Sequence, residues 1–459
     1  MKRILSSVGI LVIVFAAFSV FAIHSASPEI GNEYRKIFIV DNSGNPETLT
    51  DYQVFIEIPY DSNMQSDFDD LRFTWYNETS GDEVDIYYWL DNYVESEYAI
   101  VWVKVPHIKE HGQEVLCMRY GDPDVSSISN GKETFVFFDD FSKDTASNYD
   151  IVRGTGTFSW KPEAFLEIDD VQGSYIWIRQ KNELINVTEN KYWLETRAQL
   201  TGTGIPDMFS LFEFYDYTGD HSTAHPYRIL TAELRDTPFA PPPEGRQFEL
   251  ASWWGDPAEC DVLKFLAWEN DVWYRWSLGT SPDGTIHARL FDDSYQLMES
   301  LIGTTVHQNT DWWPGMGHNS ATSDSFTSRW DYIRVRKFAD PEPTVYVFTI
   351  TATVNIDPNT LNLKSNGQWI TAHVTFPEGY SVEDIVAETV KIEDIPLAWS
   401  EIQDSVFMAK FDRTAVQGLT DEPDYEEGTK FCEFTLIVTG ELLDGTPFEG
   451  TDTIRVIMK

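Results

Sequence analysis

The chain has 459 residues, more than one hydrophobic core normally organises, and its 42% hydrophobic and 14% aromatic residues are enough for packed domains. It carries 75 acidic and 33 basic residues, a formal net charge of −42, which repels phosphate backbones and anionic membranes. The composition therefore argues against nucleic acid as a partner, and three cysteines are too few for a disulfide framework.

The N-terminus has the pattern of an export signal. Lys2 and Arg3 precede an apolar run over residues 4–23, and small residues follow within 24–27. Because the run is almost long enough to span a bilayer, residues 1–27 are either a cleaved signal peptide or an uncleaved membrane anchor. In both cases we expect the rest of the chain to be extracellular or at the cell surface.

Residues 28–134 are expected to form a β-sandwich. Apolar residues alternate with others over 54–58 and again over 101–105, which is typical of strands with one buried face. Turn-forming residues at 80–82 (SGD) and 121–123 (GDP) separate such runs.

Residues 135–342 are long enough, with many strand-like runs, to form a single large sandwich or jelly roll. Within 272–276, Tyr274 and Trp276 fall on one face and Trp273 and Arg275 on the other. The sequence SPDG at 281–284 then predicts a hairpin turn. The run PPPEG at 241–245 predicts a surface loop.

A charged, proline-containing stretch at 337–343 (KFADPEP) predicts a short, stiff linker to a third domain. Residues 343–459 contain alternating runs such as 350–356, which fit an immunoglobulin-like sandwich without the cysteine pair of antibody domains. The predicted fold class is therefore all-β, with three β-sandwich or jelly-roll domains in series after an N-terminal hydrophobic helix.

Five motifs occur in the order found in a known family, and they lie at 67–73 (DFDDLRF), 88–90 (YWL), 101–106 (VWVKVP), 120–123 (YGDP) and 138–141 (FDDF). This segment resembles the domain of unknown function 2341, found in exported and surface proteins of archaea and bacteria. In such proteins a concanavalin-like, laminin-G-like sandwich commonly follows, and 330–337 (WDYIRVRK) looks like its closing strand. The stretch 356–364 resembles accessory β-sandwich repeats of archaeal extracellular proteins. The resemblance implies location and architecture, and it carries over no catalytic or ligand residue.

Two runs resemble catalytic motifs but lack what those motifs need. The sequence HIKEH at 107–111 has the spelling of an inverted zincin motif, yet its position after Pro106 predicts a hairpin loop where that chemistry needs a helix. The run 167–172 (EIDDVQ) resembles the E-x-D-x-x-E strand of concanavalin-fold glycosidases, but Gln172 replaces the second carboxylate. No catalytic residue is assigned, and a glycoside hydrolase is the third hypothesis.

Tryptophans of the second region are the best candidates for a ligand site, because sugars stack their apolar faces on aromatic rings. The adjacent pairs Trp253-Trp254 and Trp312-Trp313 must each place one ring on the other face of an extended strand. We therefore predict a non-catalytic binding protein that recognises carbohydrate or another surface polymer through these four residues. The alternative is a structural envelope or adhesion protein that acts through protein–protein contacts.

Asp139 and Asp140 are candidate calcium ligands, because calcium prefers clustered carboxylate and carbonyl oxygens. The pair lacks the spacing of a dedicated calcium loop. Calcium is therefore an expectation only, and no other cofactor is indicated.

Overall fold

The structure is a computed structural model that describes residues 34–171, 174–186, 191–202, 208–214, 229–236, 246–253, 260–281, 283–305, 311–319, 326–419 and 431–457. The N-terminal apolar run, the loop 241–245 and Trp254 lie outside these ranges. The described chain is mostly β, with several antiparallel sheets and few short helices. Among the described residues, no helix has the length and apolar character needed to cross a membrane.

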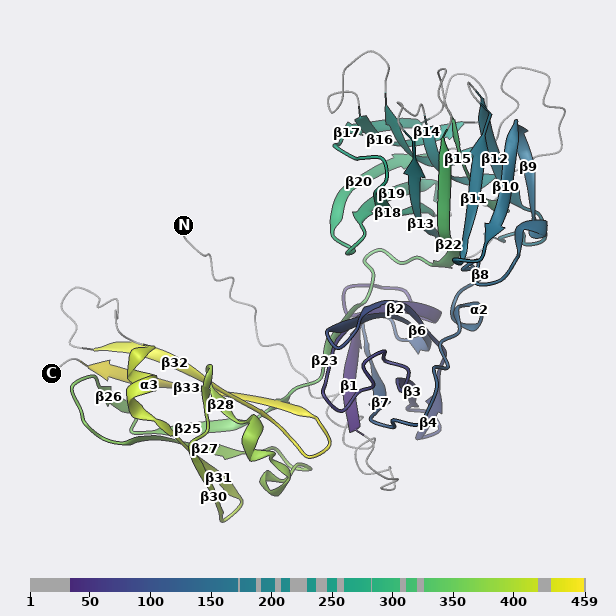
Figure 1. Cartoon of the computed structure of the whole chain (residues 1–459). Coiled ribbons are helices and arrows are strands. Elements are labelled where there is room, and N and C mark those ends of the chain that lie inside the picture. Colours follow the sequence, from purple (N-terminus) through teal and green to yellow (C-terminus); the bar gives the residue numbers. More distant parts are fainter. Residues whose placement is uncertain are drawn as a thin grey trace.

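The first unit is a two-sheet β-sandwich, shown in purple and blue in Figure 1. Its elements are β1 (Tyr34–Asp41), β2 (Leu49–Pro59), β3 (Arg72–Asn77), β4 (Asp82–Asp85), β5 (Tyr88–Val94), β6 (Tyr98–Ile108), β7 (Gln113–Tyr120), the short helix α2 (Gly131–Thr134) and β23 (Thr344–Val347). One sheet has the order β23-β1-β7-β3-β4 and the other β2-β6-β5. The alternation predicted over 54–58 is confirmed, since Val54, Ile56 and Ile58 are all buried in this core.

One strand of the first unit comes from beyond the second unit. β23 pairs antiparallel with β1, with Phe38 opposite Val347 and Asp41 opposite Thr344. The second unit is thus inserted between α2 and β23 of the first. The sequence analysis placed residues 344–347 in the third domain, because pairing with a strand near the other end of the chain leaves no local signal.

The second unit is a sandwich of two large sheets, at the top of Figure 1. Its elements are β8 (Phe137–Asp139), η1 (Ala146–Asn148), β9 (Tyr149–Gly154), β10 (Gly156–Lys161), β11 (Phe165–Asp170), β12 (Tyr175–Gln180), β13 (Tyr192–Thr201), β14 (Met208–Phe214), β15 (Ile229–Asp236), β16 (Arg246–Trp253), β17 (Cys260–Phe265), β18 (Trp273–Thr280), β19 (Thr285–Asp292), β20 (Leu297–Thr304), β21 (Trp313–Asn319) and β22 (Thr327–Lys337). The eight-stranded sheet has the order β10-β11-β22-β13-β18-β19-β20 with β8 beside β22, and the seven-stranded sheet has the order β17-β16-β15-β14-β21-β12-β9.

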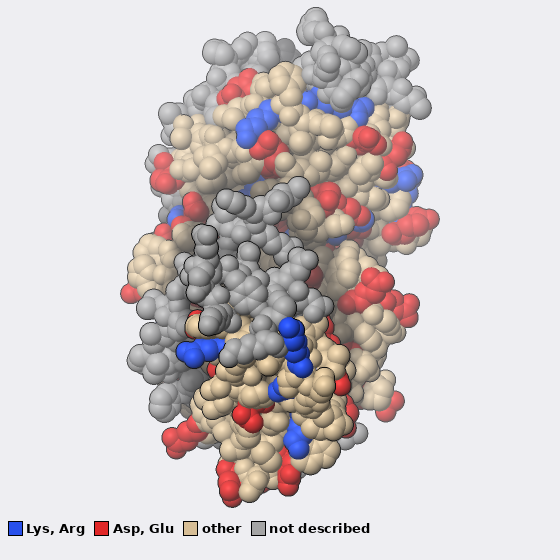
Figure 2. Space-filling view, turned by 90° about the vertical axis from the view of Figure 1, so that its left-hand side faces the viewer, with Lys and Arg blue, Asp and Glu red and all other residues tan. Residues whose placement is uncertain are grey.

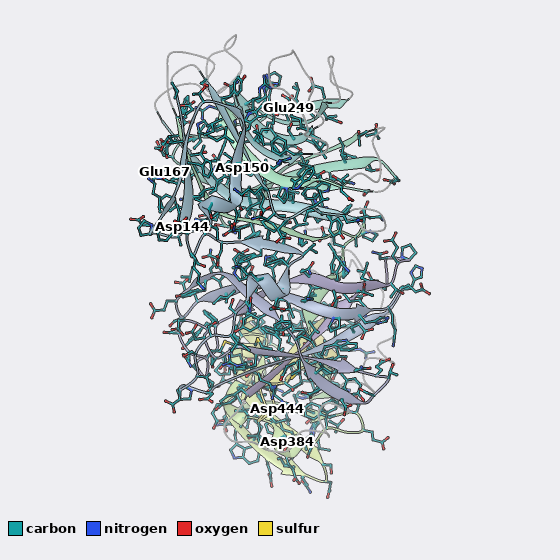
Figure 3. The ribbon with its side chains drawn as sticks, turned by 90° about the vertical axis from the view of Figure 1, so that its right-hand side faces the viewer. Asp144, Asp150, Glu167, Glu249, Asp384 and Asp444 are labelled. Atoms are coloured by element: carbon teal, nitrogen blue, oxygen red, sulfur yellow. The ribbon has the colours of Figure 1, made fainter. Side chains whose placement is uncertain are left out.

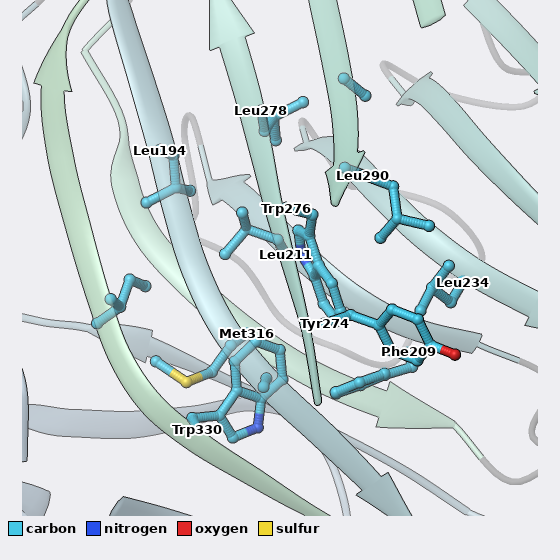
Figure 4. Packing of buried hydrophobic residues seen from close by; sticks show 14 of the residues in the cluster. Leu194, Phe209, Leu211, Leu234, Tyr274, Trp276, Leu278, Leu290, Met316 and Trp330 are labelled. Atoms are coloured by element: carbon cyan, nitrogen blue, oxygen red, sulfur yellow. The ribbon is translucent and has the colours of Figure 1, made fainter. Parts of the chain in front are cut away.

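Large apolar side chains fill the space between these two sheets. Figure 4 shows Trp276 and Trp330 packed with Phe209 and Met316, and the ring centroids of Phe209 and Trp276 lie 4.8 Å apart. The predicted division of β18 holds, because Tyr274 and Trp276 belong to this core while Arg275 lies on the other face.

The third unit is a smaller sandwich that shares a buried face with the first. Its elements are β24 (Ile350–Thr351), β25 (Thr353–Asp357), β26 (Thr360–Asn362), β27 (Trp369–Thr375), η2 (Val382–Asp384), η3 (Ala387–Thr389), β28 (Lys391–Ile392), β29 (Ile395–Pro396), β30 (Trp399–Gln403), β31 (Val406–Asp412), α3 (Arg413–Gly418), β32 (Cys432–Glu441) and β33 (Pro447–Ile457). Its sheets have the orders β24-β33-β32-β28-β29, with β26 beside β33, and β25-β27-β31-β30. Its core includes Ile37, Ile39, Val115 and Cys117 from β1 and β7, so that sheet is buried on both sides.

The first and second units are joined by ion pairs that are almost completely buried. Asp91 of β5 accepts hydrogen bonds from Arg275 at 3.0 Å and from Arg334 at 3.2 Å. Glu195 of β13 accepts from the Nε atoms of Arg334 and Arg336, each at 2.9 Å. We call these five residues the interdomain charge cluster. Asp91 alone comes from the first unit; because it binds two guanidinium groups that Glu195 and the strands of the second unit hold in place, it fixes the orientation of the two units.

Candidate functional site

The outer face of the seven-stranded sheet carries aromatic side chains beside buried polar ones. Along β14, Phe209 and Leu211 point into the core, so Ser210, Phe212 and Phe214 point to the opposite face. This outer face has an aromatic part, over β9, β12, β14 and β21, and a polar part, over β14, β15 and β16.

The aromatic part consists of Trp177, Phe212, Phe214 and Trp313, which we call the aromatic cluster. The rings of Trp177 and Phe212 lie 4.8 Å apart, and those of Phe212 and Phe214 lie 5.2 Å apart. Guanidinium groups stack on its edge, where Arg179 lies 4.7 Å from the ring of Trp313 and Arg153 lies 4.7 Å from that of Trp177. Trp313 is half-buried, so part of its ring reaches the surface.

Two glycines of β21 allow these rings to lie across the sheet. A Cβ atom on Gly315 would lie 2.2 Å from Cε2 of Phe214, and one on Gly317 would lie 2.2 Å from the backbone oxygen of Ile176. Neither distance is possible for a real side chain. The absence of side chains at these two positions is therefore what gives the aromatic cluster its space.

The polar part consists of Ser210, Thr231, Glu233 and Glu249, which we call the polar floor. In the strand register Ser210 lies opposite Glu233, and Glu233 lies opposite Glu249. All four side chains are buried, and Ser210 Oγ and Thr231 Oγ1 have no hydrogen-bond partner in the part of the chain that the structure describes. Buried polar atoms in this condition cost free energy, and a bound ligand or water normally accounts for them.

Glu249 is held from one side by a guanidinium group. Arg235 donates a hydrogen bond to Glu249 Oε2 at 2.6 Å. Burial is the main cause that raises the pKa of Glu249; Arg235 opposes this shift, and the carboxylate of Asp261 adds to it. A raised pKa favours the protonated acid, which could donate a hydrogen bond or a proton to a ligand on this face.

Among the side chains that the structure describes, one predicted tryptophan lies on this face. Trp313 belongs to the aromatic cluster. Trp312 exchanges backbone hydrogen bonds with Ile185 and is 0% exposed within the main core, so its ring offers no face to a ligand. Trp253 ends β16 opposite Ile229, but its side chain, like Trp254, lies outside the described residues.

Asp139 and Asp140 do not fit a calcium site. Asp139 is buried, and its oxygens accept hydrogen bonds from the backbone of Phe141 and from the hydroxyls of Thr145 and Tyr149. Asp140 accepts the backbone N–H of Ser142. The described residues contain no group of three or more His, Cys, Asp or Glu side chains that could hold a metal ion. Protein donors thus occupy Asp139, whose role is to hold the chain after β8.

The runs 107–111 and 167–172, which resemble catalytic motifs, lie in ordinary strands and turns of the fold. His107 lies in β6 and His111 in the turn after it, so the predicted hairpin loop is confirmed. Glu167 of β11 binds Lys161 and Arg329, and Thr327 donates to Asp169. Figure 3 shows Glu167 on the flank of the second unit, away from Glu249 near its end.

On the face seen in Figure 2, the acidic side chains of the described residues do not gather into one patch. On the side shown in Figure 2 they are scattered along the molecule, with Lys and Arg side chains between them. The sequence analysis missed the polar floor because its residues alternate with apolar ones along each strand. The same pattern is expected of any strand with one face in solvent. Trp177 was missed because a single tryptophan in an apolar run is typical of a buried core residue.

No curated protein matches this chain. Similar solved structures include lectin II from Ulex europaeus, 11% identical, covering 44% of this chain and 97% of the lectin with a TM-score of 0.34. The VIP36 exoplasmic/lumenal domain in a Ca²⁺- and Man2-bound form is 12% identical, covering 46% and 95% with a TM-score of 0.34. A legume lectin-like domain from Entamoeba histolytica is 10% identical, covering 42% and 92% with a TM-score of 0.33. At these scores the likenesses carry no argument about function.

The family comparison concerns the segment that links the first unit to the second. It covers β3 to β7, α2 and the strands up to β10, and therefore includes Asp91 of the interdomain charge cluster. Residues 67–162 match the family described as Domain of unknown function (DUF2341).

Proposed function

We propose that this chain is a cell-surface or secreted protein whose second unit binds a neutral carbohydrate on the outer face of the seven-stranded sheet. The observation that carries the proposal is the polar floor beside the aromatic cluster. Sugars present hydroxyl groups at their edges and C–H groups on their faces, which match buried oxygen atoms and aromatic rings respectively. The extracellular location rests on the apolar run at residues 4–23.

A neutral sugar fits the charge of the site better than an acidic one. Glu233 and Glu249 lie in the floor, and the whole chain carries a formal net charge of −42. An anionic polymer would therefore be repelled both at long range and at the site.

The expected affinity of one site is modest. A stacking contact on an aromatic ring contributes about 1–2 kcal/mol, and association itself costs several kcal/mol, so a single site binds weakly. Several copies on one surface would bind a polymer much more tightly through multivalency.

The test is carbohydrate binding by the full chain, in mild detergent because of its apolar N-terminal run. A glycan array identifies a ligand, and calorimetric titration then compares Trp313→Ala with the parent. We expect affinity to fall about 5- to 30-fold, as the loss of one stacking contact implies. Trp399→Ala is the matched control, because Trp399 is 43% exposed on β30 of the third unit. An array with no bound glycan, or equal losses in both variants, would overturn the proposal.

The architectural alternative has one observation in its favour. β30 is the last strand of its sheet, and it exposes Trp399 and Ile402. Nothing else in the described residues indicates a partner for that edge, so carbohydrate binding is the function we favour.

A further inference from the structure

β17 and β20 end the two sheets of the second unit on the same side of the molecule. Each is the last strand of its sheet and pairs with one neighbouring strand in the described part of the chain. A salt bridge of 2.8 Å between Lys264 and Glu299 joins the two strands. Figure 1 shows both on the side of the second unit opposite β9 and β10. We call β17 and β20 together the open edge.

The open edge exposes large apolar side chains. Leu263 and Phe265 of β17 are 42% and 68% exposed, and Leu297 and Ile302 of β20 are 57% and 62% exposed. Single exposed apolar residues are ordinary on a protein surface, but several on two joined strands are typical of a contact with another molecule. Figure 2 views the molecule from this side, and uncharged surface predominates on the described part of the second unit.

β20 also lacks the features that usually keep a sheet edge from pairing. Proteins protect such edges with charged residues, proline, short length or a covering segment. Among its eight residues β20 has a single charged one, Glu299, which pairs with Lys264. By contrast, three of the four residues of β4 are acidic, β29 has two residues including a proline, and β2 is covered by the chain at Lys337.

We propose that β20 pairs antiparallel with β20 of a second copy of this chain, so that the two eight-stranded sheets continue across a twofold axis. The sequence of β20 is self-complementary, as such an axis requires. With the axis at Ile302, this residue lies opposite its own copy and Ser300 lies opposite Thr304. β-branched side chains pair well across strands, and this register keeps the two Glu299 carboxylates from facing each other. The irregular pairing of β20 with β19 lies before residue 299 and leaves this part of the strand regular.

The size and charge of the open edge favour a weak dimer. β17 has 6 residues and β20 has 8, which is about half to two-thirds of the roughly 20–30 residues that a standard interface has on each side. The formal net charge of −42 on each copy opposes association at long range, and salt screens this repulsion. We therefore expect a dissociation constant of about 10–100 µM that falls as the salt concentration rises. The inference is independent of the proposed function, because no carbohydrate takes part.

The experiment measures self-association of the full-length protein. Sedimentation equilibrium in a density-matched mild detergent gives the dissociation constant over about 1–200 µM protein, at low and at high salt. Ile302→Lys places two like charges opposite each other at the axis, so it should weaken the dimer by about 10-fold or more. Ile402→Lys is the matched control, because Ile402 is 42% exposed on β30, the last strand of a sheet in the third unit. It should associate like the parent. All three proteins keep residues 4–23, so any association through that apolar run is the same in each.

A cross-link provides a second measurement that does not depend on the lysine variant. Opposite residues of antiparallel strands have Cα atoms about 4.5–5.5 Å apart, which is within the range of a disulfide bond. Oxidised Ile302→Cys should therefore run as a covalent dimer on a non-reducing gel. The parent and Ile402→Cys are the controls and should remain monomers there.

Three results would overturn the inference. The first is a parent that stays monomeric over the whole concentration range at high salt. The second is an Ile302→Lys variant that associates like the parent, or loses no more association than Ile402→Lys does. The third is an Ile302→Cys variant that forms no more covalent dimer than Ile402→Cys.

Discussion

His318 shows how the core of the second unit controls the protonation of a single side chain. The side chain is 0% exposed, its Nδ1 lies 2.9 Å from Ser328 Oγ, and Trp330 donates to the same hydroxyl at 2.8 Å. Burial lowers the pKa of His318 to about 3. Burial thus disfavours the charged imidazole, although the carboxylate of Asp170 lies 3.6 Å from Nε2 and acts in the opposite direction.

This shift makes the stability of the second unit depend on pH. Below about pH 6.5 the unfolded chain binds a proton at His318 and the folded chain does not, so the free energy of unfolding falls as the pH drops from about 6.5 toward 3. The slope from this group is at most about 1.4 kcal/mol per pH unit. Urea unfolding at pH 6.5, 5.5 and 4.5 should show a smaller slope in His318→Gln. His107→Gln, at a side chain 41% exposed, is the control, and equal slopes in all three proteins would contradict the expectation.

At the scale of the element, the aromatic cluster depends on the close approach of β21 to β12 and β14. Gly317 lies opposite Trp177 on one side and Ser210 on the other. A Cβ atom there would lie 2.9 Å from Trp177 Cα and closer still to the backbone oxygen of Ile176. Backbone atoms cannot move aside as a flexible side chain can.

We therefore expect Gly317→Ala to lower the free energy of unfolding by about 1–3 kcal/mol, as other overpacked positions do. It should also weaken carbohydrate binding, because Trp177 and its neighbours must shift. Gly418→Ala is the control. No atom lies within 4 Å of its added methyl group, and alanine stabilises a helix relative to glycine by up to about 1 kcal/mol. Chemical denaturation measures the free energy of unfolding of the two variants. Equal values for Gly317→Ala and Gly418→Ala would contradict a close contact at β21.

The strands were predictable where one face is buried and the signal is local. The alternation over 350–356 is confirmed in β25, where Val354 and Ile356 are buried and their neighbours are exposed. In β6, Trp102 is buried although alternation assigned it to the solvent side, because the second unit covers that face. Contacts between distant segments decide such positions, and a single sequence does not contain them.

The candidate site, too, was only partly predictable from the sequence. Trp313 was predicted because two adjacent tryptophans cannot both face one core. Glu233 and Glu249 lie on consecutive strands and become opposite neighbours only through the register of β15 and β16. Their pairing is therefore a property of the fold that no local pattern reveals.

At the scale of the whole molecule, the interdomain charge cluster fixes the second unit on the first. Asp91 lies in β5 and binds Arg275 and Arg334, which belong to two strands of the second unit. Burial opposes ionisation of Asp91, but the two guanidinium groups outweigh it, and the pKa of Asp91 is lowered. The carboxylate is therefore charged and paired.

Asp91→Ala should be strongly destabilising, because Arg275 and Arg334 stay buried and each loses one of its carboxylate partners. Breaking a buried pair in this way costs about 3–5 kcal/mol. We expect calorimetry of the variant to show two melting transitions further apart than in the parent, because the first and second units no longer unfold together. Glu47→Ala breaks the more exposed pair between Glu47 and Lys191 and should change stability by less than about 1 kcal/mol. A variant that melts like the parent would show that the cluster does not join the units.

The insertion of the second unit also determines how the molecule carries mechanical tension. A pull between the two ends of the chain enters at β1 and leaves through β23, which pair with each other in the first unit. The force then passes to the third unit along the chain after β23. The second unit lies outside this path, because the chain leaves the first unit after α2 and returns to it at β23. Stretching would open the β1–β23 pair before it could strain the seven-stranded sheet, so the polar floor and the aromatic cluster would keep their geometry on a tethered, loaded chain.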